Sequence, residues 1–107
     1  MNSNENFDGR TYIDLMNDFA KWLDRNRMGR YAQLLYFRLL QHFNRFHWPD
    51  FVQLSNAQLA EMICSTSEKT AIQARTELIE AGFIKFKQGV RGYPSEYRVA
   101  RIEKLPF

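Results

Sequence analysis

Residues 54–86 contain two helix start signals and one helix end signal, at spacings that leave room for only two helices and a strand. Ser55 is a favoured N-cap residue, and Gln58, three residues later, completes the capping-box pattern. After a short polar break, Ser67 supplies a second N-cap, and Gly82 suits the left-handed position just past a helix end. We therefore expect a helix-turn-helix that continues directly into a β-strand.

The longer helix of this pair is amphipathic. Its apolar side consists of Ala71, Ala74, Leu78 and Ile79. Its opposite side carries Lys69, Thr70, Gln73, Thr76, Glu77 and Glu80. Lysine, threonine and glutamine are side chains that meet base edges and phosphates in a major groove. This side is a candidate DNA-reading face, although any solvated helix face has a similar composition.

Arg75 does not fit this pattern. Helical spacing puts it near the middle of the apolar side. Either its stem packs along the edge of the core while its head reaches solvent, or it pairs with a carboxylate that the sequence does not identify.

Two further helices are expected before this stretch. Thr11 and Asp14 form another capping-box pattern, and apolar residues recur at helical spacing from there to Leu23. Residues 30–47 predict a second helix that is apolar over most of its circumference, so other elements must cover it on more than one side. We place it between the first helix and the helix-turn-helix, with its end before Pro49.

The remaining apolar segments have strand character. Residues 51–54 predict a short strand, and apolar and basic residues alternate over residues 84–87, which is typical of a half-buried strand. Residues 96–102 return as its hairpin partner, with Arg91 near the tip of the turn.

The fold class is therefore mainly α with a small β-hairpin (α+β), in the order α-α-β-α-α-β-β. Residues 1–10 are expected to form a flexible N-terminus. Residues 11–104 are expected to form a single domain, since 107 residues suffice for one core and not for two.

Positive charge is concentrated after the helix-turn-helix. The chain has a net charge of +3 and a pI of about 9.2. Residues 83–107 hold six Lys or Arg against two Glu, whereas residues 51–82 hold two against four. Lys87, Arg91 and Arg98 are accordingly the candidate contacts to a nucleic-acid backbone.

No catalytic or metal-binding pattern is present in the sequence. His42 and His47 are five residues apart, so they do not share a helix face as a metal pair would, and Cys64 has no second thiol. Gly89 and Gly92 lie between strands rather than before a helix, unlike a phosphate-binding loop. We expect a cytoplasmic protein that is not an enzyme and takes no cofactor and no metal.

From Tyr12 to Val99 the chain resembles the N-terminal winged helix-turn-helix domain of DnaD-like replication initiation proteins and phage replisome organisers. The resemblance rests on the opening residues 12–15 with Phe19 and Trp22, on Trp48-Pro49, on residues 73–84, and on the wing residues 87–92 before residues 97–99. It implies binding of duplex or single-stranded DNA, self-association and a role in primosome assembly. Proteins of that family usually add a helical C-terminal domain.

The expected function is thus DNA binding in replication initiation. Lys69, Thr70, Gln73 and Thr76 would enter the major groove, while Lys87, Arg91 and Arg98 would touch the backbone or the adjacent minor groove. The alternatives are a winged-helix transcriptional regulator and a protein-interaction module with little DNA affinity. In each case we expect a homodimer or a higher oligomer, because the chain is rich in aromatic residues that could be exposed: Phe7, Tyr12, Trp22, Tyr36 and Phe107.

Overall fold

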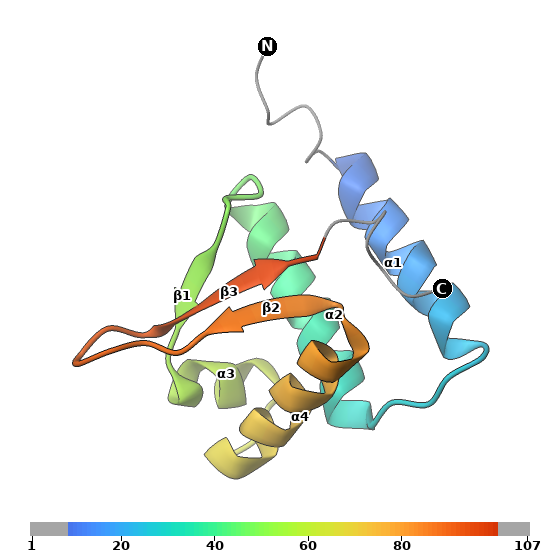
Figure 1. Ribbon diagram of the computed structural model, residues 1–107. Coiled ribbons are helices and arrows are strands. Elements are labelled where there is room, and N and C mark those ends of the chain that lie inside the picture. Colours follow the sequence, from blue (N-terminus) through green and yellow to red (C-terminus); the bar gives the residue numbers. More distant parts are fainter. Residues whose placement is uncertain (1–8, 101–107) are drawn as a thin grey trace.

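A computed structural model describes residues 9–100, with side chains from residue 11 onward, and shows a mixed α+β domain (Figure 1). Its four helices and three strands follow the order expected from the sequence. The elements are α1 (Gly9–Leu23), α2 (Arg30–Arg45), β1 (Val52–Leu54), α3 (Asn56–Met62), α4 (Glu68–Ala81), β2 (Ile84–Lys87) and β3 (Ser95–Val99).

The three strands form one antiparallel sheet in the order β1-β3-β2. The last strand is therefore the central one. Tyr97 in β3 is paired with Val52 on one side and with Phe86 on the other. The hairpin of β2 and β3 projects past β1 and α3 and ends in a long turn (Figure 1).

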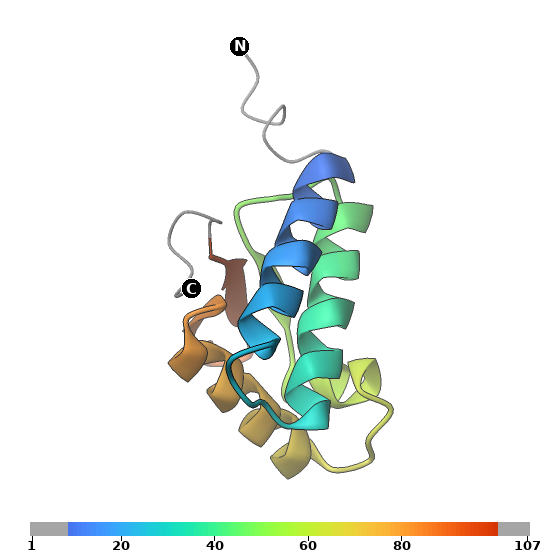
Figure 2. The ribbon, with the colours of Figure 1, turned by 90° about the vertical axis from the view of Figure 1, so that its right-hand side faces the viewer.

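Helix α2 is the central element of the core, as its apolar circumference predicts. It contacts α1 on one side and both α3 and α4 on another. Figure 2 shows α1 and α2 side by side, running in opposite directions. Its fully or nearly fully buried residues are Ala32, Leu35, Tyr36, Leu39, Leu40 and Phe43.

An aromatic cluster joins α1, α2 and the start of β2. The ring of Phe83 lies 5.0 Å from the ring of Phe19 and 5.0 Å from that of Trp22. Both contacts are edge-to-face, a geometry that aromatic quadrupoles favour. Tyr36 completes the cluster, with its ring 4.6 Å from Phe19.

The local signals around α3 and α4 are confirmed. Ser55 Oγ accepts a hydrogen bond from the Gln58 backbone N–H at 3.1 Å, and Gln58 Oε1 accepts one from the Ser55 N–H at 2.8 Å. Ser67 Oγ accepts from the Thr70 N–H at 3.2 Å. Gly82 ends α4 with a φ of 87°, a left-handed conformation that costs glycine little.

Two expectations for the N-terminal helix are wrong. Helix α1 begins at Gly9, so Thr11 lies inside the helix rather than at its N-cap. Ile13 is 58% exposed, although the sequence pattern puts it on the apolar side. It lies at the margin of that side, where α2 does not cover it. Residues 1–8 and 101–107, including the ends of the expected domain and of the expected last strand, lie outside the described residues.

The end of α2 also differs from the expectation. The helix stops at Arg45, and His47 and Trp48 then take positive φ values of 60° and 57°. The Trp48 backbone N–H bonds back to the Phe43 carbonyl at 2.8 Å, and its indole Nε1 donates to Asn44 Oδ1 at 3.0 Å. These contacts stabilise an unusual backbone conformation before Pro49 is reached.

Candidate nucleic-acid interface

The predicted reading face lies on the solvent side of α4. Ala71, Ala74 and Leu78 are buried against the rest of the domain, which fixes the orientation of the helix. At about 100° per residue, Lys69, Gln73 and Thr76 fall within about 60° of one another on the opposite side. All three side chains are exposed, and Thr70 is half-buried at the flank.

Two side chains on the predicted polar side of α4, Thr76 and Glu77, are already engaged within the domain. Thr76 Oγ1 donates to the Ile72 carbonyl at 2.9 Å. Glu77 Oε1 accepts a hydrogen bond at 2.9 Å from the backbone N–H of Gly29, the N-cap of α2. A carboxylate there is favoured by the dipole of α2. Glu77 therefore has a structural partner on the flank of α4 that faces α2.

The charged residues of the hairpin lie on the sheet face that is turned away from α4. Tyr97 and Phe86 contact Arg75 of α4, and side chains alternate along a strand, so their neighbours point to the other face. The register pairs Lys85 with Arg98, and Lys87 with Glu96. Lys87 and Arg98 thus share one surface, but they do not converge with the reading face of α4.

The side chain of Arg98 contacts residues directly before β1 rather than residues at the tip of the hairpin. Its guanidinium group forms an ion pair with Glu96 at 3.6 Å and lies 5.0 Å from the Phe51 ring centre. Nη1 also donates to the Asp50 carbonyl at 3.4 Å. Of the three predicted backbone contacts, Arg98 is the one that the fold already uses.

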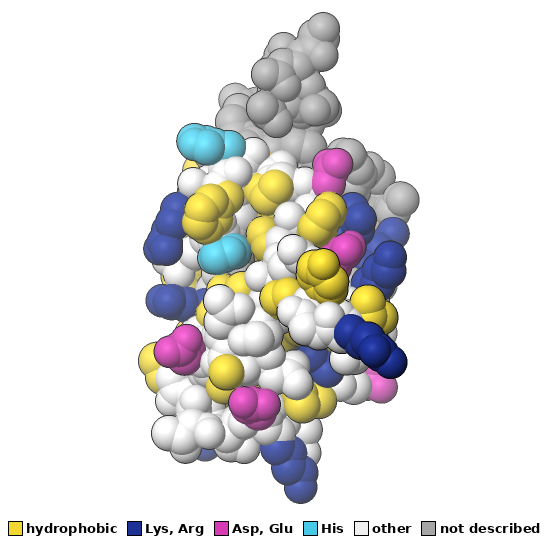
Figure 3. Space-filling model, turned by 90° about the vertical axis from the view of Figure 1, so that its left-hand side faces the viewer, with side chains coloured by type: hydrophobic (Ala, Val, Ile, Leu, Met, Phe, Trp, Pro, Cys, Tyr) yellow, Lys and Arg dark blue, Asp and Glu magenta, His cyan; other side chains and the backbone are white. Residues whose placement is uncertain are grey.

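Arg91 lies in the β2–β3 turn (residues 88–94), as expected. The Tyr93 N–H donates to the Val90 carbonyl at 2.9 Å, and Arg91 and Gly92 between them have φ values of 24° and 77°. This is a tight turn of the primed kind, which matches the twist of a hairpin. Figure 3 views the molecule from the side toward which this turn projects. Apolar side chains are scattered over this face, Lys and Arg lie mostly toward its edges, and some Asp and Glu lie among them.

Arg75 is the residue that the sequence left unexplained. Nη1 donates to Asn56 Oδ1 at 3.1 Å and to the Tyr97 hydroxyl at 3.0 Å, and the guanidinium carbon lies 4.1 Å from the Phe86 ring centre. Its partners are neutral oxygens and an aromatic face within the domain. Of the two alternatives that the sequence left open, the carboxylate partner is not found among the described residues, and the head group bonds inside the domain instead of only reaching solvent. Burial raises the pKa of Tyr97, and the hydrogen bond and charge of Arg75 oppose that rise.

The exposed aromatic residues are not those expected from the sequence. Tyr36 is fully buried, and Tyr12 and Trp22 are partly buried. Phe7 and Phe107 lie outside the described residues. The large hydrophobic residues that are exposed are Ile13, Tyr31, Phe37, Phe46, Phe51, Val90 and Tyr93.

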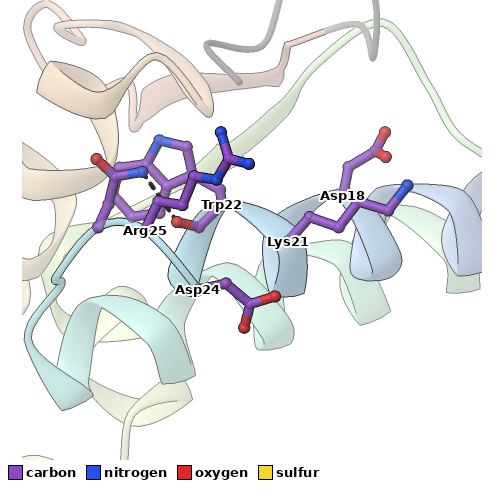
Figure 4. Close-up of a pocket in the computed structure, with 6 residues that line it drawn as sticks. Asp18, Lys21, Trp22, Asp24 and Arg25 are labelled. Atoms are coloured by element: carbon purple, nitrogen blue, oxygen red, sulfur yellow. Dashed lines mark hydrogen bonds between the residues drawn. The ribbon is translucent and has the colours of Figure 1, made fainter.

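A hollow beside the C-terminal half of α1 is lined by Asp18, Lys21, Trp22, Asp24, Arg25 and Asn26 (Figure 4). One carboxylate and one cation, Asp18 and Lys21, come from α1, and the other two, Asp24 and Arg25, come from the turn that follows it. Asp24 points away from Asp18 and Lys21. The Asn26 amide donates to the Trp22 carbonyl at 2.9 Å, which closes the helix end. The hollow therefore offers no convergent set of groups for a ligand.

Residues 9–100 contain neither a cluster of metal-ligating side chains nor a membrane-spanning helix. No group of three or more His, Cys, Asp or Glu side chains there could hold a metal ion. Burial, aided by the nearby charge of Arg45, lowers the pKa of His42, whose ring packs on Phe46. No helix in the same range is long and apolar enough to cross a bilayer.

The described residues thus define a small α+β domain with a helix pair and a projecting hairpin. Comparison with known proteins finds no matching family model, no matching curated protein and no matching solved structure.

Proposed function

We propose that this chain contains a winged helix-turn-helix DNA-binding domain, in which α3 and α4 are the helix-turn-helix and the β2–β3 hairpin is the wing. The observation that carries the proposal is the exposed polar side of α4. Its apolar side is buried by the domain, while Lys69, Gln73 and Thr76 face solvent on the other. A helix presented in this way fits a major groove about 12 Å wide.

Two groups of residues would divide the contact. Lys69 and Thr70 lie in the first turns of α4, where residues of a recognition helix meet base edges, and Gln73 and Thr76 follow on the same side. Lys87 and Arg91 would neutralise phosphates beside the groove. Arg98 would contribute less, because Glu96 already pairs with it.

Within this class we propose a replication initiation or replisome-organising role. The support is the resemblance of residues 12–99 to DnaD-like domains, together with the absence of any sequence pattern for catalysis. The alternative in transcription has the same fold and would require a specific, repeated target sequence.

A second candidate function is protein association, and the exposed side chains of Tyr31, Phe37 and Phe46 favour it. All three belong to α2 or its C-cap. We propose a homodimer or a higher oligomer. Analytical ultracentrifugation tests this, and a monomer at micromolar concentration would contradict it.

Fluorescence-anisotropy titration tests DNA binding. Labelled duplex and single-stranded oligonucleotides are titrated at two salt concentrations with the parent protein and with the Lys87→Ala/Arg91→Ala variant. The variant Lys21→Ala/Arg25→Ala is the matched control, because it removes the same charge from two exposed positions, one in the last turn of α1 and one in the turn that follows it. We expect salt-dependent binding that the hairpin variant weakens and the control retains. No binding at low salt would overturn the proposed function.

A further inference from the structure

The β2–β3 turn (residues 88–94) exposes two large apolar side chains. Val90 and Tyr93 are each 70% exposed, the highest values among the large hydrophobic residues that are described. They are the first and last residues of the tight turn closed by the Tyr93 N–H to Val90 carbonyl bond. Arg91, one of the two residues between them, is exposed.

The backbone of this turn is held in place by its own contacts. The Gly89 N–H donates to Ser95 Oγ at 3.0 Å, in addition to the bond that closes the turn. A Cβ at Gly89 would collide with the Tyr93 carbonyl oxygen, so the two arms of the turn are in close contact there. The exposed ring of Tyr93 is thus presented on an ordered backbone rather than on a loose loop.

The surroundings of the Tyr93 ring favour a nucleobase over a protein surface as its binding partner. Two side chains offer far less area than the roughly 800 Å² per partner of a stable protein interface. A nucleobase, by contrast, has a flat face that matches one aromatic ring. Arg91 lies in the same turn as Tyr93, Lys87 ends the strand that leads into this turn, and both are exposed. Glu96, the acidic residue of the described hairpin, is already paired with Arg98. Aromatic rings flanked by free cations are the usual platform for unpaired strands.

We propose that Tyr93 stacks on an unpaired nucleobase, so that the preferred ligand is single-stranded DNA or a duplex with a single-stranded extension. This rests on the proposed function and specifies its substrate. Arg91 and Lys87 contact the phosphates on either side of the stacked base. A base within a closed duplex is not available to the ring unless the stack is opened.

The test compares a blunt duplex with the same duplex carrying a short oligothymidine extension that contains one 2-aminopurine. We expect the parent to prefer the extended probe and to change the 2-aminopurine emission. Tyr93→Ala should lose about 5- to 100-fold of affinity for the extended probe and the emission change, with duplex affinity altered less than about twofold. Tyr93→Phe keeps the ring and should behave as the parent.

Other results would overturn either the stacking proposal alone or the proposed function as well. If Tyr93→Ala binds both probes as the parent does, or weakens both equally, the stacking proposal is wrong while the proposed function stands. If the parent binds neither probe, the proposed function fails as well. Tyr93-dependent binding to phosphatidylserine vesicles without any 2-aminopurine response would assign the turn to a lipid surface instead.

Discussion

Nη1 of Arg75 in α4 donates a hydrogen bond to the hydroxyl of Tyr97 in β3 at 3.0 Å. The same guanidinium group reaches Asn56 in α3 and lies over the Phe86 ring in β2. One side chain therefore connects both helices of the pair to both strands of the hairpin. It fixes the position of the hairpin relative to the exposed side of α4.

Replacing Arg75 with alanine should lower the free energy of unfolding by roughly 1–3 kcal/mol. The change leaves the Tyr97 hydroxyl and the Asn56 side-chain Oδ1 without the Arg75 donor and removes the guanidinium from the Phe86 face. Urea unfolding followed by circular dichroism measures it. The exposed Gln73→Ala variant on the same helix should stay within about 0.5 kcal/mol of the parent. Equal stability of the two variants would contradict the role of Arg75.

Tyr36 and Tyr97 allow a matched comparison of two buried hydroxyls. The Tyr36 hydroxyl has no hydrogen-bond partner among the described residues, whereas that of Tyr97 is bonded to Arg75. Tyr36→Phe should leave stability unchanged or raise it, while Tyr97→Phe should cost about 0.5–1.5 kcal/mol. The two variants differ from the parent by the same atom, so urea unfolding compares them directly. A reversed order would contradict this hydrogen-bond assignment.

Alkaline pH should destabilise the protein through the same two residues. Burial raises the pKa of Tyr36, with a further contribution from Asp18, and burial also raises that of Tyr97. Above about pH 10 the unfolded chain loses these protons while the folded chain retains them, so stability falls as pH rises. Urea midpoints from about pH 8 to about pH 11 test this. Tyr36→Phe should flatten the decline, and an unchanged slope would remove Tyr36 as its source.

Glu77→Ala should lower the free energy of unfolding by about 0.5–2 kcal/mol. Its carboxylate accepts the Gly29 N–H at the start of α2, and such contacts at helix N-termini are worth this much. Glu80→Ala is the control, because it removes the same charge from an exposed position on the same helix. Thermal unfolding of both variants side by side gives the difference. A similar loss in both would point to net charge rather than to the contact.

If α4 reads bases, Gln73→Ala and Arg91→Ala should differ in kind. Gln73→Ala should cost roughly 1–3 kcal/mol at one base position only. Arg91→Ala should weaken binding to all sequences alike and reduce the salt slope by about one. Competition with singly substituted duplexes at several salt concentrations separates the two patterns. A uniform loss from Gln73→Ala would place that residue on the backbone instead.

The helix ends around α3 and α4 were predictable because their causes are local. The capping box of Ser55 and Gln58 spans four residues, and the left-handed conformation of Gly82 follows from its lack of a Cβ. The same holds for the buried residues of α2, whose number alone requires cover on several sides. These features need no knowledge of the rest of the chain.

The contacts between distant segments were not predictable in this way. The partners of Arg75 come from α3, β2 and β3. The contact between the Arg98 guanidinium and the Phe51 ring depends on the strand order β1-β3-β2, which places β3 beside β1. The start of α1 at Gly9 shows the limit of local signals too, since a capping pattern at Thr11 occurs inside a helix. Spacing marks where an element can begin, and packing decides where it does.

The central place of β3 in the sheet also sets the order in which the molecule can assemble. Val52 precedes the helix pair and finds its partner only in Tyr97, after that pair has been made. Pairing between such distant segments is slow, because a long loop must close before any bond repays it. The sheet cannot be complete until β3 is paired on both sides, so the strand that carries the hairpin is also the one that holds β1 in the sheet.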